Sequence, residues 1–284
     1  MRVKAPLLGC VKALLSEGWR GRGAAALIAS IARLAAPRKA VALRNLSLAF
    51  PHSDENWRRD LLGEVYGHLA LSLVEFLVVQ KDPDRVLSWF DEVSGLEHFE
   101  RALSLGRGVV MLTGHIGNWE LLGAWLCRKG YPMYAVVQRN EDAETEALIE
   151  ASRRRIGLRT LPKSFGMKAS LRALKEGAVV ALLADQHGGD CLADFMGRQA
   201  MTFSGPAAFS LLSGAPVVPV VSFRKAPFLH EVRILPPLVP PEGDRKEKVE
   251  ALTRRANAIL ESLIRLHPEQ WLWLHRRWRV EEGH

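Results

Sequence analysis

A histidine and a glutamate five positions apart, His115 and Glu120, have the types and spacing for acid–base chemistry. On one continuous helix, five positions would place the two side chains about 140° apart, so they could not face each other. They can meet only if the chain turns between them, and Gly114 and Gly117 permit such a turn. A carboxylate bonded to one imidazole nitrogen leaves the other nitrogen free to accept a proton. The spacing therefore predicts that Glu120 orients His115 as a general base. The alternative is a histidine that caps a helix, with a glutamate near the helix N-terminus.

The residues around this pair predict the end of a buried strand followed by a helix. Residues 109–112 are a short apolar run, and a helical pattern begins near Asn118. Strands are predicted at 109–113, 133–137, 158–161, 178–184 and 216–223, and they alternate with helices at 118–129, 142–156, 165–176 and 205–213. This alternation predicts an α/β fold with a mostly parallel central sheet covered by helices. Polar side chains at the carboxyl ends of its strands would share one edge.

The flanking segments predict further elements. Residues 6–36 indicate one or two amphipathic helices interrupted near Gly18–Gly23, and Ser53 is the expected N-cap of a helix that reaches about Gln80. Within that helix we interpret His68 as an edge residue and Glu75 as a solvated or capped one. Residues 228–235 predict a strand at the edge of the sheet, and residues 245–266 a long helix. We divide the chain into a basic amphipathic arm, 1–44, and one larger domain, 45–284, which contains the candidate catalytic residues.

The positive charge is concentrated in that arm. The 284 residues carry a net charge of +8, and residues 1–44 hold nine basic residues and one acid, which accounts for the whole excess. Such an arm suits an anionic membrane surface, at about 1 kcal/mol per basic residue near the surface. No nucleic-acid partner is expected, because no aromatic interleaving or nucleic-acid module accompanies the charge. The apolar residues 24–36 are too few for a membrane span, which needs about 20, so we expect an interfacial helix.

Other residues could bind a substrate. Asp185 and Gln186 follow another buried strand and so occupy a position like that of His115, although an aspartate in a turn can also simply cap a neighbouring element. Arg139 follows the strand at 133–137 and could hold a phosphate or phosphopantetheine group, or be a plain surface arginine. The expected loop before the helix at 205–213 contributes Arg198, Thr202 and Gly205, with helix N-terminal amides that favour anions. The three cysteines are far apart and predict neither a disulfide framework nor a zinc site, and no metal is expected.

Several motifs together resemble one enzyme family. Gly114-His-Ile-Gly-Asn-Trp-Glu120 is similar to the His-x4-Asp/Glu signature of glycerolipid-type acyltransferases, and more narrowly to the lipid A late acyltransferases (lauroyl and myristoyl transferases). The same family order is matched by Arg44-Asn-Leu-Ser-Leu-Ala-Phe-Pro51, Leu183-Ala-Asp-Gln186, Phe195-Met-Gly-Arg-Gln-Ala-Met-Thr202, Gly214-Ala-Pro-Val-Val-Pro219 and Pro268-Glu-Gln-Trp-Leu-Trp-Leu-His-Arg-Arg-Trp278. The resemblance covers roughly residues 38–279. Two departures are Asn140, where the family usually has proline after the arginine, and the N-terminus, where family members commonly have a transmembrane helix.

The resemblance implies O-acyl transfer from an acyl thioester, on acyl carrier protein or coenzyme A, to a hydroxyl of a membrane glycolipid such as a lipid A precursor. His115 would be the base and Glu120 its partner, with no cofactor besides the thioester co-substrate. Asn118, Arg139, Asp185, Gln186, Arg198, Thr202 and Gly205 would bind substrate. The backbone amides of Gly117 and Asn118 are candidate oxyanion donors. The implied location is the cytoplasmic face of the bacterial inner membrane, as a peripheral or monotopic protein.

Three rival functions remain open from the sequence. The same signature would serve a lysophospholipid or phosphatidylinositol-mannoside acyltransferase. A thioester hydrolase would use water in place of the acceptor, although no Gly-x-Ser-x-Gly motif of a serine hydrolase is present. A non-catalytic lipid-binding protein is disfavoured by the intact His115, Glu120 and Asp185.

Overall fold

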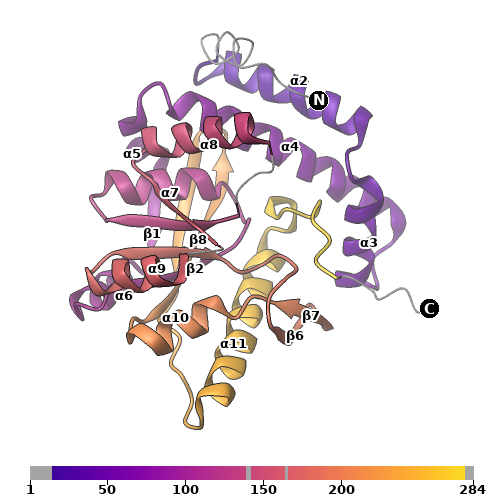
Figure 1. Ribbon diagram of the computed structural model, residues 1–284. Helices are drawn as coiled ribbons and strands as arrows, with labels where there is room; N and C mark the ends of the chain where they lie inside the picture. Colours follow the sequence, from indigo (N-terminus) through magenta and orange to yellow (C-terminus); the bar gives the residue numbers. More distant parts are fainter. Residues whose placement is uncertain (1–14, 139–141, 164–165, 279–284) are drawn as a thin grey trace.

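The computed structural model describes residues 15–138, 142–163 and 166–278 (Figure 1). The helices are α2 Trp19–Ala35, α3 Lys39–Ala49, α4 Glu55–Val79, α5 Val86–Trp89, α6 Leu96–Ser104, α7 Trp119–Arg128, α8 Ala143–Arg155, α9 Gly166–Lys175, α10 Gly205–Ser213 and α11 Arg245–Leu266, with short 3-10 turns η1 Pro83–Arg85 and η2 Pro268–Gln270. The strands are β1 Phe90–Ser94, β2 Val109–Thr113, β3 Met133–Val137, β4 Arg159–Pro162, β5 Val179–Leu183, β6 Cys191–Phe195, β7 Arg198–Thr202, β8 Val217–Ala226 and β9 Leu229–Ile234. The predicted α/β fold is confirmed.

A seven-stranded sheet organises the molecule, in the order β1-β9-β8-β2-β5-β3-β4. All neighbouring strands run parallel except β8 and β9, which form an antiparallel pair. The strand predicted at 228–235 is confirmed as β9, but its predicted place at the edge is wrong, because β1 pairs with β9 and takes the edge. β2 and β5 pair in parallel, residue for residue, from Val109↔Val179 to Thr113↔Leu183.

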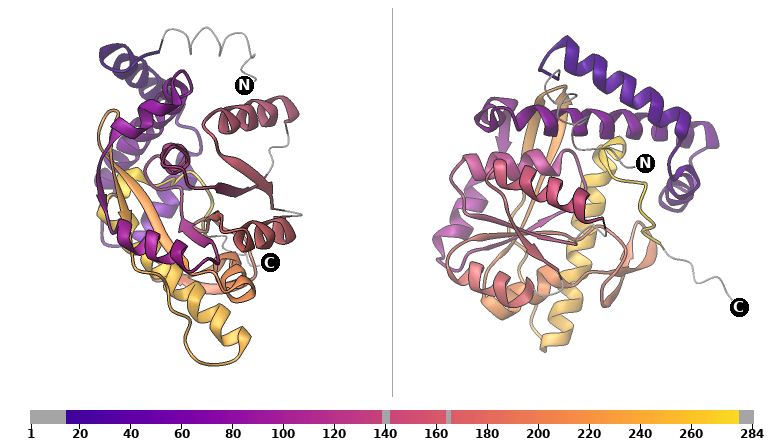
Figure 2. Two further views of the ribbon diagram at one scale, coloured as in Figure 1. Left: turned by 90° about the vertical axis from the view of Figure 1, so that its left-hand side faces the viewer. Right: turned by 45° about the horizontal axis from the view of Figure 1, so that its top comes forward.

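Each face of the sheet packs against its own set of helices (Figure 2). Side chains of β2 and β5 alternate between the faces, and both strands are buried on both sides, which explains their uninterrupted apolar sequences. Val110, Leu112 and Leu182 pack with α9, α10 and α11 on one face. Val109 and Met111 pack with α4, α5, α6 and α7 on the other. Both cores converge on the carboxyl ends of the central strands, and they hold that edge rigid.

The N-terminal helices lie along α4 rather than apart from the domain (Figure 1). Gly21, Ala25 and Ala29 of α2 are buried. The predicted interruption near Gly18–Gly23 is confirmed only at Gly18, a non-helical residue with φ of +84° that precedes α2, because the helix continues through Gly21 and Gly23. The predicted helical residues 6–14 lie outside the described part. α3 continues across residues 44 and 45, where the sequence analysis divides the chain. The division into an arm and a domain stays a prediction. α4 begins one residue later than predicted, with Asp54 as its N-cap accepting from the backbone of Trp57. α4 has the length and composition of a membrane span, but it is largely buried inside the protein, as core helices also are.

The predicted loop before the helix at 205–213 is instead a β-hairpin. β6 and β7 pair antiparallel around Met196 and Gly197, and the hairpin packs against α11. Its outer residues alternate with buried ones, such as Phe195 and Ala200, so each strand has one covered face. The hairpin therefore fixes the position of Arg198 and Thr202, which lie at the two ends of β7.

Candidate functional site

His115 and Asp185 meet at the carboxyl edge of the sheet. β2 and β5 are neighbours in register through Thr113↔Leu183, and each of the two residues follows its strand by two positions. Nδ1 of His115 lies 2.9 Å from Oδ1 of Asp185, and the backbone N–H of His115 donates to Oδ2 at 2.7 Å. The predicted convergence of the two residues is confirmed. The carboxylate that orients His115 is therefore Asp185, 70 residues away in the sequence.

Asp185 is fully buried and held by a third donor, Nε1 of Trp271, at 2.7 Å. Burial raises the pKa of this carboxyl, but the facing His115 ring and the hydrogen bonds from His115 and Trp271 outweigh burial and keep the pKa below its usual value. The ionised carboxylate accepts the proton on Nδ1 of His115, so the lone pair of the imidazole is on Nε2. The side-chain amide of Gln186 lies 3.3 Å from that nitrogen, and both residues line the same cavity.

Glu120 does not bond His115, and the predicted His115–Glu120 pair is wrong. Both carboxylate oxygens of Glu120 bind Arg153 of α8, with Nη2 of Arg153 at 2.5 Å from Oε1. Glu120 lies on α7 one position after Trp119, whose ring packs edge-on against His115 at 4.9 Å between centroids. The five-residue spacing thus brings Glu120 to the wall of the same cavity as His115, where it ties α7 to α8.

A cavity of about 340 Å³ opens beside His115. Its inner wall is apolar and includes Met111, Met133, Ala135, Gly123 and Leu158. Its outer part is polar and is lined by His115, Glu120, Gln138, Arg153, Lys163, Gln186 and His187. An apolar interior behind polar and cationic groups suits a ligand with an aliphatic tail and an anionic head. His115 is among the polar residues that line the cavity.

The turn after His115 depends on Gly117. Its φ of +59° is in the left-handed region, and a Cβ would lie 1.8 Å from the carbonyl oxygen of Ser222, so no other residue fits. The N–H of Gly117 donates to the carbonyl of Gln270 at 2.8 Å. The predicted oxyanion role of the Gly117 amide is therefore wrong, because that donor is already used by the backbone.

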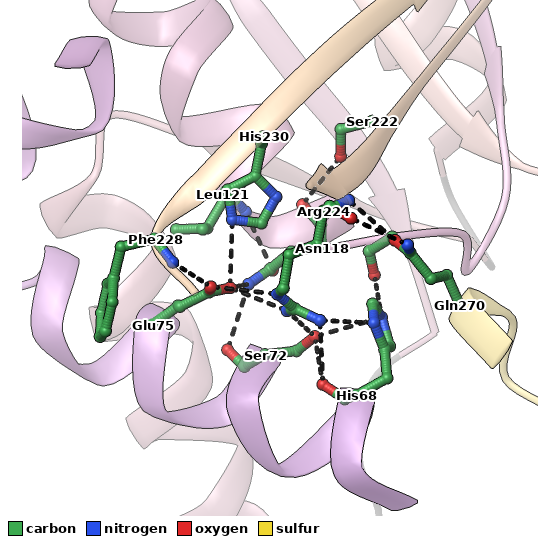
Figure 3. A network of polar contacts seen from close by, with 11 residues as sticks. His68, Ser72, Glu75, Asn118, Leu121, Ser222, Arg224, Phe228, His230 and Gln270 are labelled. Atoms are coloured by element: carbon green, nitrogen blue, oxygen red, sulfur yellow. Dashed lines mark hydrogen bonds and ion pairs between the residues drawn. The ribbon is translucent and has the colours of Figure 1, made fainter. Parts of the chain in front are cut away.

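A buried ionic network supports this turn from below (Figure 3). Glu75 of α4 is fully buried, and its carboxylate accepts from Arg224 Nη2 at 2.8 Å, from Asn118 Nδ2 at 2.9 Å and from the backbone N–H of Phe228 at 2.9 Å. Nε2 of His230 lies 3.2 Å from the same carboxylate. Burial raises the pKa of Glu75, but Arg224 and His230 outweigh it and hold that pKa well below its usual value. The prediction of a solvated or capped Glu75 is wrong, since a buried carboxylate needs such a shell of donors.

His68 is also part of this network rather than an edge residue. Its Nε2 donates to the carbonyl of Gly117 at 3.0 Å, and Arg224 donates to its Nδ1. Burial and the charge of Arg224 lower the pKa of His68 to about 3, so the ring is neutral at physiological pH. Asn118 caps α7 by accepting from Leu121 N and directs its amide at Glu75. The prediction that the Asn118 side chain binds substrate is wrong, because its polar atoms are used inside the protein.

The remaining predicted residues lie away from the His115 cavity or outside the described part. Arg139 falls in residues 139–141, which the structure does not describe. Arg198 lines a separate open hollow with Phe50, Trp57 and Arg265. Thr202 is buried and accepts from Arg277 Nη2 at 2.8 Å, and Gly205 is the buried first residue of α10, so Thr202 has a structural role in the hairpin and Gly205 in the helix.

The C-terminal segment, which the sequence analysis named only for its family resemblance, completes the site. Trp271, Trp273 and Trp278 are buried and belong to the core. Arg277 is also fully buried, donates to the carbonyl of Met201 and lies 4.5 Å from the centre of the Phe195 ring. Burial lowers the pKa of Arg277 to about 10, and the charge of Asp185 opposes that shift, so the guanidinium stays charged at neutral pH.

Sequence reasoning missed the partners that are distant in the chain: Trp271, Arg153 and the residues around Glu75. Asp185 was predicted to lie near His115 because it follows a neighbouring parallel strand. A buried-looking acid in an otherwise apolar helix was the signal for Glu75. Taken together, the site holds an imidazole oriented by Asp185, with its second nitrogen beside the amide of Gln186 in the lining of the cavity. Such a site can remove a proton from a hydroxyl or from water.

Comparisons with known proteins identify the family to which the chain belongs. The family model described as bacterial lipid A biosynthesis acyltransferase matches residues 13–280. The lipid A biosynthesis lauroyltransferase of Escherichia coli K12 is 30% identical over 248 residues, which cover 86% of this chain and 79% of that protein. The palmitoleoyltransferase of the same strain is 31% identical over 251 residues, again 86% and 79%. A phosphatidylinositol mannoside acyltransferase of Mycolicibacterium smegmatis is 26% identical over 193 residues, which cover 66% of this chain and 62% of that protein.

Proposed function

Because the chain belongs to the bacterial lipid A biosynthesis acyltransferase family, we propose that it transfers a fatty acyl group from an acyl thioester to a hydroxyl of a lipid A precursor. Family membership makes the chain an acyl-transferring enzyme. The observation that carries the finer proposal is the position of His115, whose Nε2 is kept as a proton acceptor by Asp185 at the opening of an apolar cavity. A thioester with its chain in the cavity would present its carbonyl beside that nitrogen.

The proposed reaction is a direct transfer with His115 as general base. Nε2 takes the proton of the acceptor hydroxyl as the oxygen attacks the thioester carbonyl. The tetrahedral intermediate collapses, the C–S bond breaks, and the proton on Nε2 passes to the leaving sulfur. Asp185 stabilises the imidazolium that exists between these steps, as the acid does in hydrolase triads. General-base catalysis contributes about 10²–10⁴-fold, so positioning of the two substrates must provide much of the remaining acceleration.

The donor is expected to be acyl carrier protein or acyl-CoA. Both carry a phosphopantetheine arm, and the polar part of the cavity offers Lys163 and Arg153 beside His187. Arg153 is engaged by Glu120, whereas the Nζ of Lys163 lies over the Phe203 ring at 4.9 Å from its centre. Lys163 is therefore the best-placed cation for the donor phosphate.

We also propose that α2 rests on an anionic membrane, at the cytoplasmic face of the bacterial inner membrane. Trp19, Leu27, Ile31 and Leu34 are exposed and recur at helical spacing, and Leu34 is 88% exposed. The opposite side of α2 packs on α4, and among the described residues the stripe is left exposed. Basic residues flank the stripe, including Arg20 and Arg22. An apolar stripe with basic neighbours is typical of helices that lie in the membrane interface.

The acceptor has one serious alternative, a mannosylated phosphatidylinositol, because relatives of that name match two thirds of the chain. The test supplies purified enzyme with acyl carrier protein or CoA thioesters and, in separate reactions, a lipid A precursor, a lysophospholipid or a mannosylated phosphatidylinositol, and identifies products by mass spectrometry. The proposal expects acylation of the lipid A precursor above the others. Preferential acylation of another lipid would replace the acceptor, and release of free fatty acid with every acceptor would indicate a hydrolase.

A further inference from the structure

The apolar part of the cavity exists because small residues face each other across it. Ala135 of β3 and Ala181 of β5 are register partners on the face of the sheet that α7 covers. Gly123 of α7 lines the cavity together with both alanines. Larger side chains at these three positions would bring α7 and the sheet into contact and fill the space. Glycine inside a helix is less favourable than alanine, so the opening is maintained at a cost in helix stability.

The far end of this channel is closed by larger side chains. Met133 precedes Ala135 by two residues on the same face of β3, and Leu158 packs beside Gly123. From Val137, near the mouth, to Met133 the strand rises about 13 Å. The channel therefore has a definite depth, with Gly123 on its wall one helical turn beyond Trp119 and Met133 at its end.

We propose that Gly123 determines which fatty acyl chain length the enzyme transfers, an inference that rests on the proposed acyl transfer and assigns the chain to this channel. Gly123 has an ordinary helical backbone, and a Cβ there would lie 3.4 Å from Leu158 Cδ2, which is van der Waals contact. Alanine thus fits with little adjustment. A longer side chain must extend into the channel and occupy the space of the distal methylenes of the acyl chain.

The test compares Gly123→Ala and Gly123→Leu with the wild type over a series of acyl thioesters of increasing chain length. Loss should grow with chain length, reaching about ten-fold or more in kcat/KM for the longest chain that the wild type uses, since each methylene that no longer fits is worth about 10-fold or more. Met133→Ala should change the preference in the opposite direction, toward longer chains. Ala147→Leu adds three carbons, one fewer than Gly123→Leu, on the exposed side of α8 and serves as the matched control.

Each result decides the inference. A uniform loss for all chain lengths in a folded Gly123→Leu protein, checked by circular dichroism and thermal unfolding, would overturn it, because a structural defect is insensitive to the donor. If Gly123→Leu fails to fold, Gly123→Ala and Met133→Ala still decide, and an unchanged preference in both would overturn it. Absence of transfer by the wild type with every donor would instead refute the proposed function, and the chain-length inference with it.

Discussion

Replacing Asp185 by asparagine removes the charge that orients His115 and keeps the shape of the side chain. Oδ2 of Asp185 accepts from the His115 backbone and from Trp271 Nε1, both at 2.7 Å, so the amide oxygen of the asparagine takes that position. The amide nitrogen then faces Nδ1 of His115 and donates to it. The imidazole consequently carries its proton on Nε2, which can no longer accept the proton of the hydroxyl.

The expected loss follows from the wrong tautomer. General-base catalysis is worth about 10²–10⁴-fold, and a wrongly protonated histidine in a hydrolase triad costs about 10⁴-fold. We expect Asp185→Asn to lower kcat about 10³–10⁴-fold, with a KM for the donor close to that of the wild type, since Asp185 is buried behind His115. Steady-state transfer kinetics on protein shown to be folded by circular dichroism measure both parameters. A folded variant with kcat within ten-fold of the wild type would show that the charge of Asp185 does not set the tautomer of His115.

The pH dependence of the free energy of unfolding of the same variant tests whether the Asp185 carboxylate is ionised in the folded protein. The pKa of Asp185 in the folded protein is below its unfolded value of about 3.9, so the carboxylate stabilises the fold fully above that pH. This contribution is lost as pH falls through the folded-state pKa. The difference in free energy of unfolding between the wild type and Asp185→Asn should therefore be largest at neutral pH and shrink below about pH 4. Urea unfolding across this range measures it, and a difference that grows on acidification would contradict it.

Three further predictions concern the surroundings of the site. Glu120→Gln weakens the ion pair with Arg153 that links α7 to α8 and leaves His115 unchanged. The pH profile of kcat/KM should therefore keep its wild-type shape, and turnover should fall less than in Asp185→Asn. A loss equal to that of Asp185→Asn would contradict this. Glu75→Ala leaves Arg224 buried without its partner and should lower the free energy of unfolding by about 3–5 kcal/mol in denaturant titrations, whereas Glu64→Ala on the exposed side of α4 should change it by about 0.5 kcal/mol at most. Leu34→Glu should weaken sedimentation with anionic vesicles and leave transfer to detergent-dispersed acceptor unchanged; undiminished vesicle binding would remove α2 from the membrane contact.

The sequence predicted the central strands and their helices because each is specified by its own residues. β2, β3 and β5 are short apolar runs, and α11 has the predicted bounds because its own N-cap, Asp244, closes a capping box with Glu247. β1 and the β6–β7 hairpin were not predicted, because their sequences are polar on one face and depend on the elements that cover the other. The pattern of apolar and polar residues within one strand does not indicate which distant element covers it.

The pairing of acids and bases was the least predictable part of the site. Glu120 is near His115 in the sequence, but the helix directs its carboxylate to Arg153, 33 residues later. Asp185 reaches His115 through the register of two parallel strands, which the sequence suggests only as a shared edge. Glu75 illustrates the same limit, since its donors come from α7, β8, β9 and the turn between those two strands.

His115 is proposed to remove the proton of a glycolipid hydroxyl during acyl transfer. The direct measurement is the rate of acylated lipid A precursor formation, followed by mass spectrometry, by the purified wild type and by His115→Ala at equal concentration. The wild type should form the acylated product, and folded His115→Ala should form none above the rate without enzyme. Near-normal product formation by His115→Ala would show that His115 is not the general base.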